Sequence, residues 1–253
     1  MCSSDLIFER LDFEKINYSK AYYDLKATVM PTEDYEGIKV KLESNLPGSD
    51  IRYRYYNSGF HHYSEPVGIG KKMELGFSVF KNNEPVKISS QKFFFNKATG
   101  KKITLANEAS KNYPGDGAFT LVNGVQNEKG FAKASEFLGF LGTDLDATID
   151  LGKEMEISKI TLHTLNLNGS WIYLPDWVDV SFLPDPDSNN KYRPVETFSR
   201  IIMDEDNVIV VELDKPKSGR YIRVVAKNIG IIPSGKPGAG NPAWLFVDEI
   251  EVQ

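Results

Sequence analysis

Cysteine is almost absent from this chain of 253 residues, which contains Cys2 and no other cysteine. A single thiol excludes an internal disulfide framework. Histidine is nearly as rare, and His61, His62 and His163 show no metal-ligand spacing. His61 and His62 are adjacent, and neighbours on a strand point to opposite sides. We therefore expect this pair to be exposed polar residues of a strand or loop.

Long apolar runs and an excess of positive charge are also missing. No stretch approaches the roughly 20 apolar residues of a membrane span. The formal net charge is −5 with both signs interspersed, so the chain lacks the basic stripe that nucleic-acid binding requires. We expect neither a membrane span nor nucleic acid as a partner. The hydrophobic content of 41% and the charged content of 26% are typical of a globular protein.

The amino terminus, "MCSSDL", has neither the basic nor the apolar part of a signal peptide. Residues 2–6 resemble the translated end of a common sequencing adapter. We expect Met1–Leu6 to be an assembly scar and the native gene to continue upstream. The chain is then the C-terminal fragment of a longer protein.

A glycine-rich stretch near the C-terminus, "GIIPSGKPGAGNPAWLF", has the spacing of a nucleotide-binding loop. Gly230, Gly235 and Lys236 match G-x-x-x-x-G-K, but that loop needs a hydroxyl residue after the lysine and then a helix. Pro237 stands at the hydroxyl position, and the glycines and proline that follow disfavour a helix. The pattern indicates an ordered surface loop at one end of a domain, near "NLNGSW".

Most periodic segments alternate with period two, which is typical of strands. Predicted strands of the first half are 37–44, 50–56, 73–80 and 86–95, and those of the second half are "ATIDLG", "ISKITLHTL", "DWVDVSFLP", "NVIVVELDKP", "GRYIRVVAKN" and "WLFVDEIEVQ". Between the halves, Asn96–Lys102 reads as a polar linker and a domain boundary. The pattern predicts an all-β fold of two β-sandwich domains.

The order of motifs in the second half adds a resemblance. "LVNG", "IDLG", "SWIYLPDWVDVSF", "RYIRVVAKNIG" and "AWLFVDEIEV" follow one another as in the discoidin, or coagulation-factor type C, jelly roll that includes carbohydrate-binding module family 32. Together with "IRYRYYNSGFHHYSEPV", the series resembles the C-terminal end of bacterial glycoside hydrolase family 20 β-N-acetylhexosaminidases. The chain departs from this pattern at "RYYNSG" and with Asn123 for Asp, Phe137 for Trp and Lys236 for His.

The resemblance implies a domain organisation and a function. It places a scar and leading segment, the end of a missing catalytic domain, at 1–30, a fibronectin-III-like β-sandwich at 31–98 and a discoidin-like jelly roll at 103–253. We expect a non-catalytic accessory region, secreted, periplasmic or at a bacterial cell surface, with the catalytic domain of the same polypeptide and N-acetylhexosamine-containing glycans as partners. Two alternatives are a structural module that docks on the catalytic domain without binding glycan, and a free-standing lectin.

Adjacent carboxylates occur at Asp248 and Glu249, as in the catalytic pair of family 20 enzymes. Neighbours on a strand face opposite ways and cannot converge on one bond, so we expect no catalysis from them. "DLD" (Asp144–Asp146) and "DED" (Asp204–Asp206) are interpreted as solvated turns.

Sugar rings stack on aromatic side chains and bind polar side chains through their hydroxyls. Aromatic residues within polar loops are therefore candidate ligand-binding residues, together with one amide and one lysine; the set is Tyr113, Asn168, Trp171, Tyr173, Lys236 and Trp244. Core packing is the alternative for Trp171 and Trp244, and a solvated side chain is the alternative for Lys236. Trp177 is expected in the core or on a sheet face.

The resemblance further implies a structural calcium ion near the "NG" turn and the closing acidic residue. Calcium prefers carboxylate and carbonyl oxygens. Asn123 and Glu249 are the candidate ligands.

Overall fold

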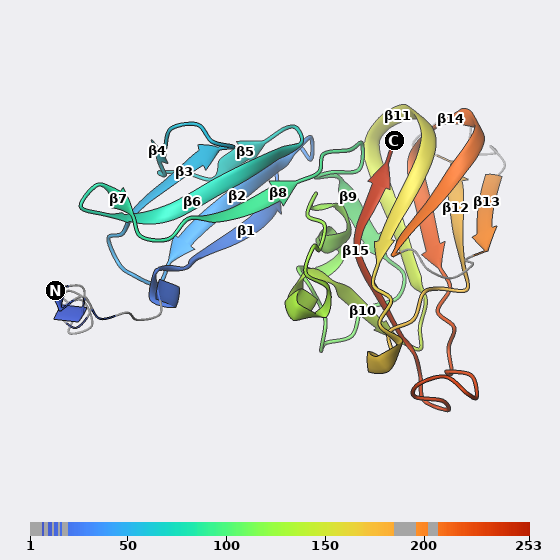
Figure 1. The fold of residues 1–253 in the computed structure, drawn as a ribbon. Helices are drawn as coiled ribbons and strands as arrows, with labels where there is room; N and C mark the ends of the chain where they lie inside the picture. Colours follow the sequence, from blue (N-terminus) through green and yellow to red (C-terminus); the bar gives the residue numbers. More distant parts are fainter. Residues whose placement is uncertain are drawn as a thin grey trace. The chain divides into compact units, whose positions relative to one another are not determined.

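The structure is a computed structural model that describes residues 7, 10–11, 13–14, 16, 20–184, 196–201 and 207–253. Met1–Leu6 and the predicted turn Asp204–Asp206 lie outside the described residues. The described chain consists mainly of antiparallel strands with short 3₁₀-helices between them, which confirms the all-β fold class (Figure 1). No helix in these ranges is long and apolar enough to cross a membrane.

The chain divides into two compact units. The first contains the described residues up to Thr28 together with Lys41–Val67 and Glu74–Gln91, and the second contains Val29–Val40, Gly68–Met73 and Lys92–Gln253. The expected domain ranges 31–98 and 103–253, and the fibronectin-III-like identity of the first, stay predictions.

The N-terminal elements are η1 (Lys20–Tyr23), β1 (Leu25–Pro31), β2 (Ile38–Ser44), β3 (Asp50–Tyr55), β4 (His61–His62), β5 (Val67–Ile69), β6 (Met73–Lys81), β7 (Glu84–Pro85) and β8 (Ser89–Phe93). They form a sheet of order β1-β2-β5 and a sheet of order β4-β3-β6-β7, in which β8 also pairs with β6. His61 pairs with Tyr53 and His62 with Arg52. Both histidines are exposed on opposite faces of β4, as predicted.

The C-terminal elements are β9 (Lys102–Leu105), η2 (Gly117–Val122), η3 (Gly130–Glu136), β10 (Leu138–Leu141), β11 (Leu145–Thr164), η4 (Asn168–Ser170), β12 (Trp177–Leu183), β13 (Glu196–Ile201), β14 (Val208–Ala226) and β15 (Trp244–Val252). The strand order is β10-β15-β11-β14-β12-β13, with β9 also on β11. The first half of β11 pairs with β9 and the end of β14, whereas its second half pairs with β15 and the start of β14. The long antiparallel pair of β11 and β14 thereby contributes to two layers, and the buried core lies between them.

The sequence predicted each of these two long strands as two strands joined by a loop, and this was wrong. β11 and β14 run side by side through the predicted gaps and curve together (Figure 1). Register shifts between Asp150 and Met155 and between Ile157 and Lys159 absorb the bend. Bulges increase local twist without ending a ladder, and they do not interrupt strand pairing as a loop does.

The polar segment around residues 96–101 is not a free linker. Lys97 N–H donates to the Val252 carbonyl and Gly100 N–H to the Val122 carbonyl. Ala98 is fully buried, and Gly100 lies so close to the Gly37 backbone that a side chain has no room there. This segment is therefore folded into the second unit.

Candidate functional site

The glycine-rich loop before β15 is ordered by successive reverse turns. The amides of Lys236, Ala239 and Asn241 donate to the carbonyls of Pro233, Lys236 and Gly238, each three residues earlier. Gly235, Gly238 and Gly240 have positive φ, which glycine adopts at no steric cost. The glycines and prolines that exclude a phosphate-binding helix thus form a compact series of turns. This is the ordered loop that the sequence predicted.

This loop lies against the segment that carries η4. The Tyr173 hydroxyl donates to the Pro237 carbonyl at 2.8 Å. Lys236 Nζ lies 5.6 Å from the centre of the Tyr173 ring. The predicted proximity of the loop to "NLNGSW" is confirmed. Burial raises the pKa of the Tyr173 phenol, so at neutral pH this side chain stays a hydrogen-bond donor.

A pocket of about 160 Å³ opens between these two segments, and it gathers three of the predicted ligand residues. It is lined by Asn166, Asn168, Tyr173, Leu174, Pro175, Asp176, Ile229 and Lys236. The Oδ1 atom of Asn168 is buried and has no hydrogen-bond partner among the described residues. An unsatisfied buried acceptor is costly, and a ligand that donates a hydrogen bond would relieve that cost.

Tyr113 and Trp244 do not line this pocket; they belong to a separate aromatic cluster. Their rings meet edge to face at 5.1 Å, and the Tyr113 ring also contacts Phe246 at 4.7 Å and Phe131 at 6.2 Å. Trp244 and Phe246 lie two residues apart on β15 and so share one face of the strand. Phe131 is partly exposed beside them and was missed by the sequence analysis. The only sequence signal for Phe131 was the one that identified Tyr113, namely an aromatic residue within a polar loop.

The other two tryptophans are not core residues. Trp171 is 40% exposed and Trp177 is 38% exposed. Core packing was therefore the wrong alternative for Trp171. Trp177 lies on a sheet face, where its Nε1 donates to Asp179 Oδ2 at 3.3 Å, so the sheet-face alternative is confirmed.

The adjacent carboxylates of β15 are both buried, and both accept hydrogen bonds from the loop between η2 and η3. Asp248 Oδ2 accepts the Asn127 amide at 2.6 Å, and Glu249 Oε2 accepts the Gly124 amide at 3.1 Å. Burial raises the pKa of Asp248 to about 6 and that of Glu249 well above its usual range. Both carboxylates are thus engaged with the backbone of the same loop.

The predicted calcium ligands offer an incomplete oxygen set. Asn123 Oδ1 already accepts the Val125 amide at 2.8 Å, and the Gly124 carbonyl accepts the Phe94 amide. The side chains of the described residues provide no group of three or more His, Cys, Asp or Glu placed to hold a metal. Calcium takes six to eight oxygens, so an ion at Glu249 would need further carbonyl or water oxygens. Calcium binding stays a prediction.

The "DLD" segment is not a solvated turn. Asp144 Oδ2 lies 2.9 Å from Lys227 Nζ, and Asp146 forms a bidentate pair with Arg223 at 2.6 and 2.8 Å. The interpretation was wrong because Asp146 belongs to β11, where the pairing with β14 places Arg223 two residues from its partner Val225.

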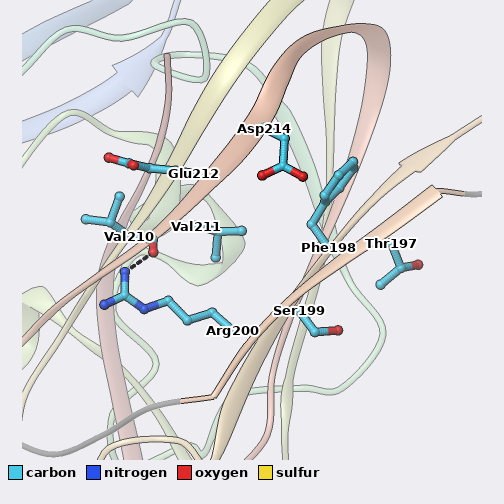
Figure 2. A pocket seen from close by; sticks show the side chains of 8 residues that line it. All are labelled: Thr197, Phe198, Ser199, Arg200, Val210, Val211, Glu212 and Asp214. Atoms are coloured by element: carbon cyan, nitrogen blue, oxygen red, sulfur yellow. Dashed lines mark hydrogen bonds between the residues drawn. The ribbon is translucent and has the colours of Figure 1, made fainter.

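A larger hollow of about 640 Å³ lies between β13 and β14 (Figure 2). Arg200 reaches across it from β13 and donates to the Val210 carbonyl of β14. None of the predicted site residues lines this hollow. We assign it no ligand.

No protein-family model and no curated protein matches the chain. Among solved structures, it is similar to a fucose-binding module of Streptococcus pneumoniae, SpX-3, at 19% identity and a TM-score of 0.41, covering 63% of this chain and 98% of that one. The lectin domain of lectinolysin complexed with Lewis b antigen gives 18% identity and a TM-score of 0.42, covering 63% and 96%. The family 32 carbohydrate-binding module of C. perfringens NanJ, in complex with galactose, gives 12% and 0.40, covering 60% and 91%. These neighbours are carbohydrate-binding modules.

Proposed function

We propose that the chain binds carbohydrate at the pocket between η4 and the loop before β15. The observation that carries this proposal is the convergence of Asn168, Tyr173 and Lys236, from two segments distant in sequence, on one small pocket. Ligand sites combine an apolar lining with a few placed polar groups. At about 160 Å³ the pocket suits a single sugar unit.

The lining chemistry favours an N-acetylated sugar. An acetamide has one N–H donor, one carbonyl acceptor and one methyl group. Asn168 Oδ1 is a buried acceptor that needs a donor, and the Lys236 ammonium is a donor to a carbonyl. Leu174, Pro175 and Ile229 supply apolar surface for the methyl group. We therefore propose N-acetylhexosamine as the preferred ligand.

The sequence resemblance extends the proposal to the parent protein. It supports an accessory region of a β-N-acetylhexosaminidase that acts outside the cytoplasm, with a catalytic domain on the same polypeptide and a calcium ion at Asn123 and Glu249.

Calorimetric titration with two matched trisaccharides tests the proposal. Chitotriose carries acetamides where cellotriose carries hydroxyls, and we expect the chain to bind chitotriose at least about tenfold more tightly, since a tenfold ratio needs only ~1.4 kcal/mol. Lys236→Ala and Asn168→Ala should each remove most of this preference. Lys153→Ala, at an exposed lysine in the bend of β11, is the control and should leave it unchanged.

Equal binding of both trisaccharides would contradict the acetamide preference while retaining a sugar site. Absence of binding to either would overturn the proposed function and favour the module that docks on a catalytic domain.

A further inference from the structure

The backbone of Trp171 adopts a conformation that bulky residues rarely take. Its φ of 64° and ψ of 19° lie in the left-handed region. Its amide donates to the Asn168 carbonyl at 3.0 Å, and its carbonyl accepts the Trp244 amide at 2.9 Å. Such a conformation persists only where the surroundings fix it, and it is a reason to ask what the side chain does.

The indole ring of Trp171 rests on the Cα atom of Gly238. A Cβ atom added to Gly238 would lie 2.5, 2.6 and 2.8 Å from three atoms of the pyrrole ring, Cδ1, Nε1 and Cε2. Gly238 also has a φ of 81°, so this position requires glycine for two reasons. The ring and the glycine fit together only because no side chain stands between them.

This contact lies next to the residue that enters the pocket. Lys236 precedes Pro237, whose carbonyl accepts the Tyr173 hydroxyl, and Pro237 precedes Gly238. The turn amide of Ala239 in addition donates to the Lys236 carbonyl. The two residues after Lys236 are thus each held by the segment on which the pocket is built. Trp171 itself is not among the pocket residues.

We propose that Trp171 and Gly238 form a latch that fixes the loop before β15 so that Lys236 stays at the pocket above Tyr173. Trp171 is then a positioning residue and not the sugar-stacking residue that the sequence suggested. The effect of the latch on ligand rests on the proposed function, but the latch itself can be tested without ligand.

Thermal unfolding of the full chain tests the latch through two glycines of the same loop. Gly238 and Gly240 have φ values of 81° and 85°, but a Cβ at Gly240 meets nothing within 4 Å. Alanine therefore strains both backbones alike, and only Gly238→Ala also displaces the indole. We expect Gly240→Ala to lower Tm by about 2–4 °C and Gly238→Ala to lower it further. In a Trp171→Ala background the two alanines should cost the same.

Chitotriose titration tests the positioning role. Gly238→Ala and Trp171→Ala should weaken binding about tenfold, whereas Gly240→Ala should stay within about twofold. Because Trp171 acts through Lys236, the double variant Trp171→Ala/Lys236→Ala should bind no more weakly than Lys236→Ala alone.

Equal Tm losses for the two glycine variants in the wild-type background would overturn the latch. Additive losses of affinity in the double variant would show that Trp171 contacts the sugar itself. If the wild-type chain binds no chitotriose, the proposed function fails, and the melting comparison still decides whether the latch exists.

Discussion

Asp248 is a carboxylic acid whose burial opposes its charged form. The side chain is almost fully buried on β15, and the Asn127 amide is its hydrogen-bond donor. Desolvation outweighs that hydrogen bond, so the pKa rises from 3.8 to about 6. A folded state that holds a proton more tightly than the unfolded chain gains stability at low pH.

The stability of the protein should therefore depend on Asp248 between pH 4 and pH 7. Its contribution is complete below the unfolded pKa of 3.8 and is lost as the pH rises through about 6. The loss is on the order of 3 kcal/mol for a shift of about two pKa units. In urea unfolding, Asp248→Asn should flatten this decline, because an amide does not titrate.

Glu65→Gln, at an exposed carboxylate, serves as the control and should leave the decline as it is in the wild type. Parallel pH profiles for wild type and Asp248→Asn would show that Asp248 does not titrate in this window.

The sequence predicted only in part which of the candidate site residues lie close together in the structure. The proximity of Tyr173 and Lys236 was foreseen because loops at one end of a sandwich cluster. The separation of Trp244 from these two residues was not foreseen, because it depends on the face of β15 on which Trp244 lies. That face is set by the register of β10 with β15, in which Leu141 pairs with Trp244, and a period-two pattern does not encode it.

Strands with several alternating residues were predicted well, and strands without them were missed. β2, β3, β8, β12 and β15 all fall within predicted segments, and β6 extends one residue beyond its segment. β4, β5, β7, β9 and β10 span only two to four residues each, which is too short for a period to appear. The continuity of β11 and β14 was hidden because their charged and glycine-containing middles look like loops.

The bend of β14 places Gly219 against the ring of Phe182. A Cβ atom at Gly219 would lie 2.6 Å from Phe182 Cδ1, whereas one at Gly68 of β5 meets nothing within 4 Å. Both glycines have ordinary φ values. Gly219→Ala should lower the free energy of unfolding by about 1–3 kcal/mol through overpacking, and Gly68→Ala should change it by less than about 0.5 kcal/mol. Equal effects in urea titrations would show that the bend has room to relax.

The folded state of residues 96–101 bears on where the intact chain can be cut. The sequence suggested a polar linker and a domain boundary there, but the Lys101 side chain is only 5% exposed, and backbone hydrogen bonds hold the residues around it. Proteases need a locally open backbone. Trypsin should therefore cleave after Lys129, which lies exposed in a loop, before it cleaves after Lys101.

A time course followed by mass spectrometry would give the order of the cuts. Early cleavage after Lys101 would instead support the linker and domain boundary predicted at Asn96–Lys102.

The pairing of β10 with β15 has a consequence for how the chain acquires its fold. Leu138 pairs with Val247 and Leu141 with Trp244, so the edge strand β10 depends on a segment that lies far beyond it in the sequence. On the ribosome, β10 emerges long before its neighbour in the sheet has been synthesised, and the core between the layers cannot close until β15 has emerged. Contacts so distant in sequence form slowly. The second unit therefore completes its fold only after β15 has emerged.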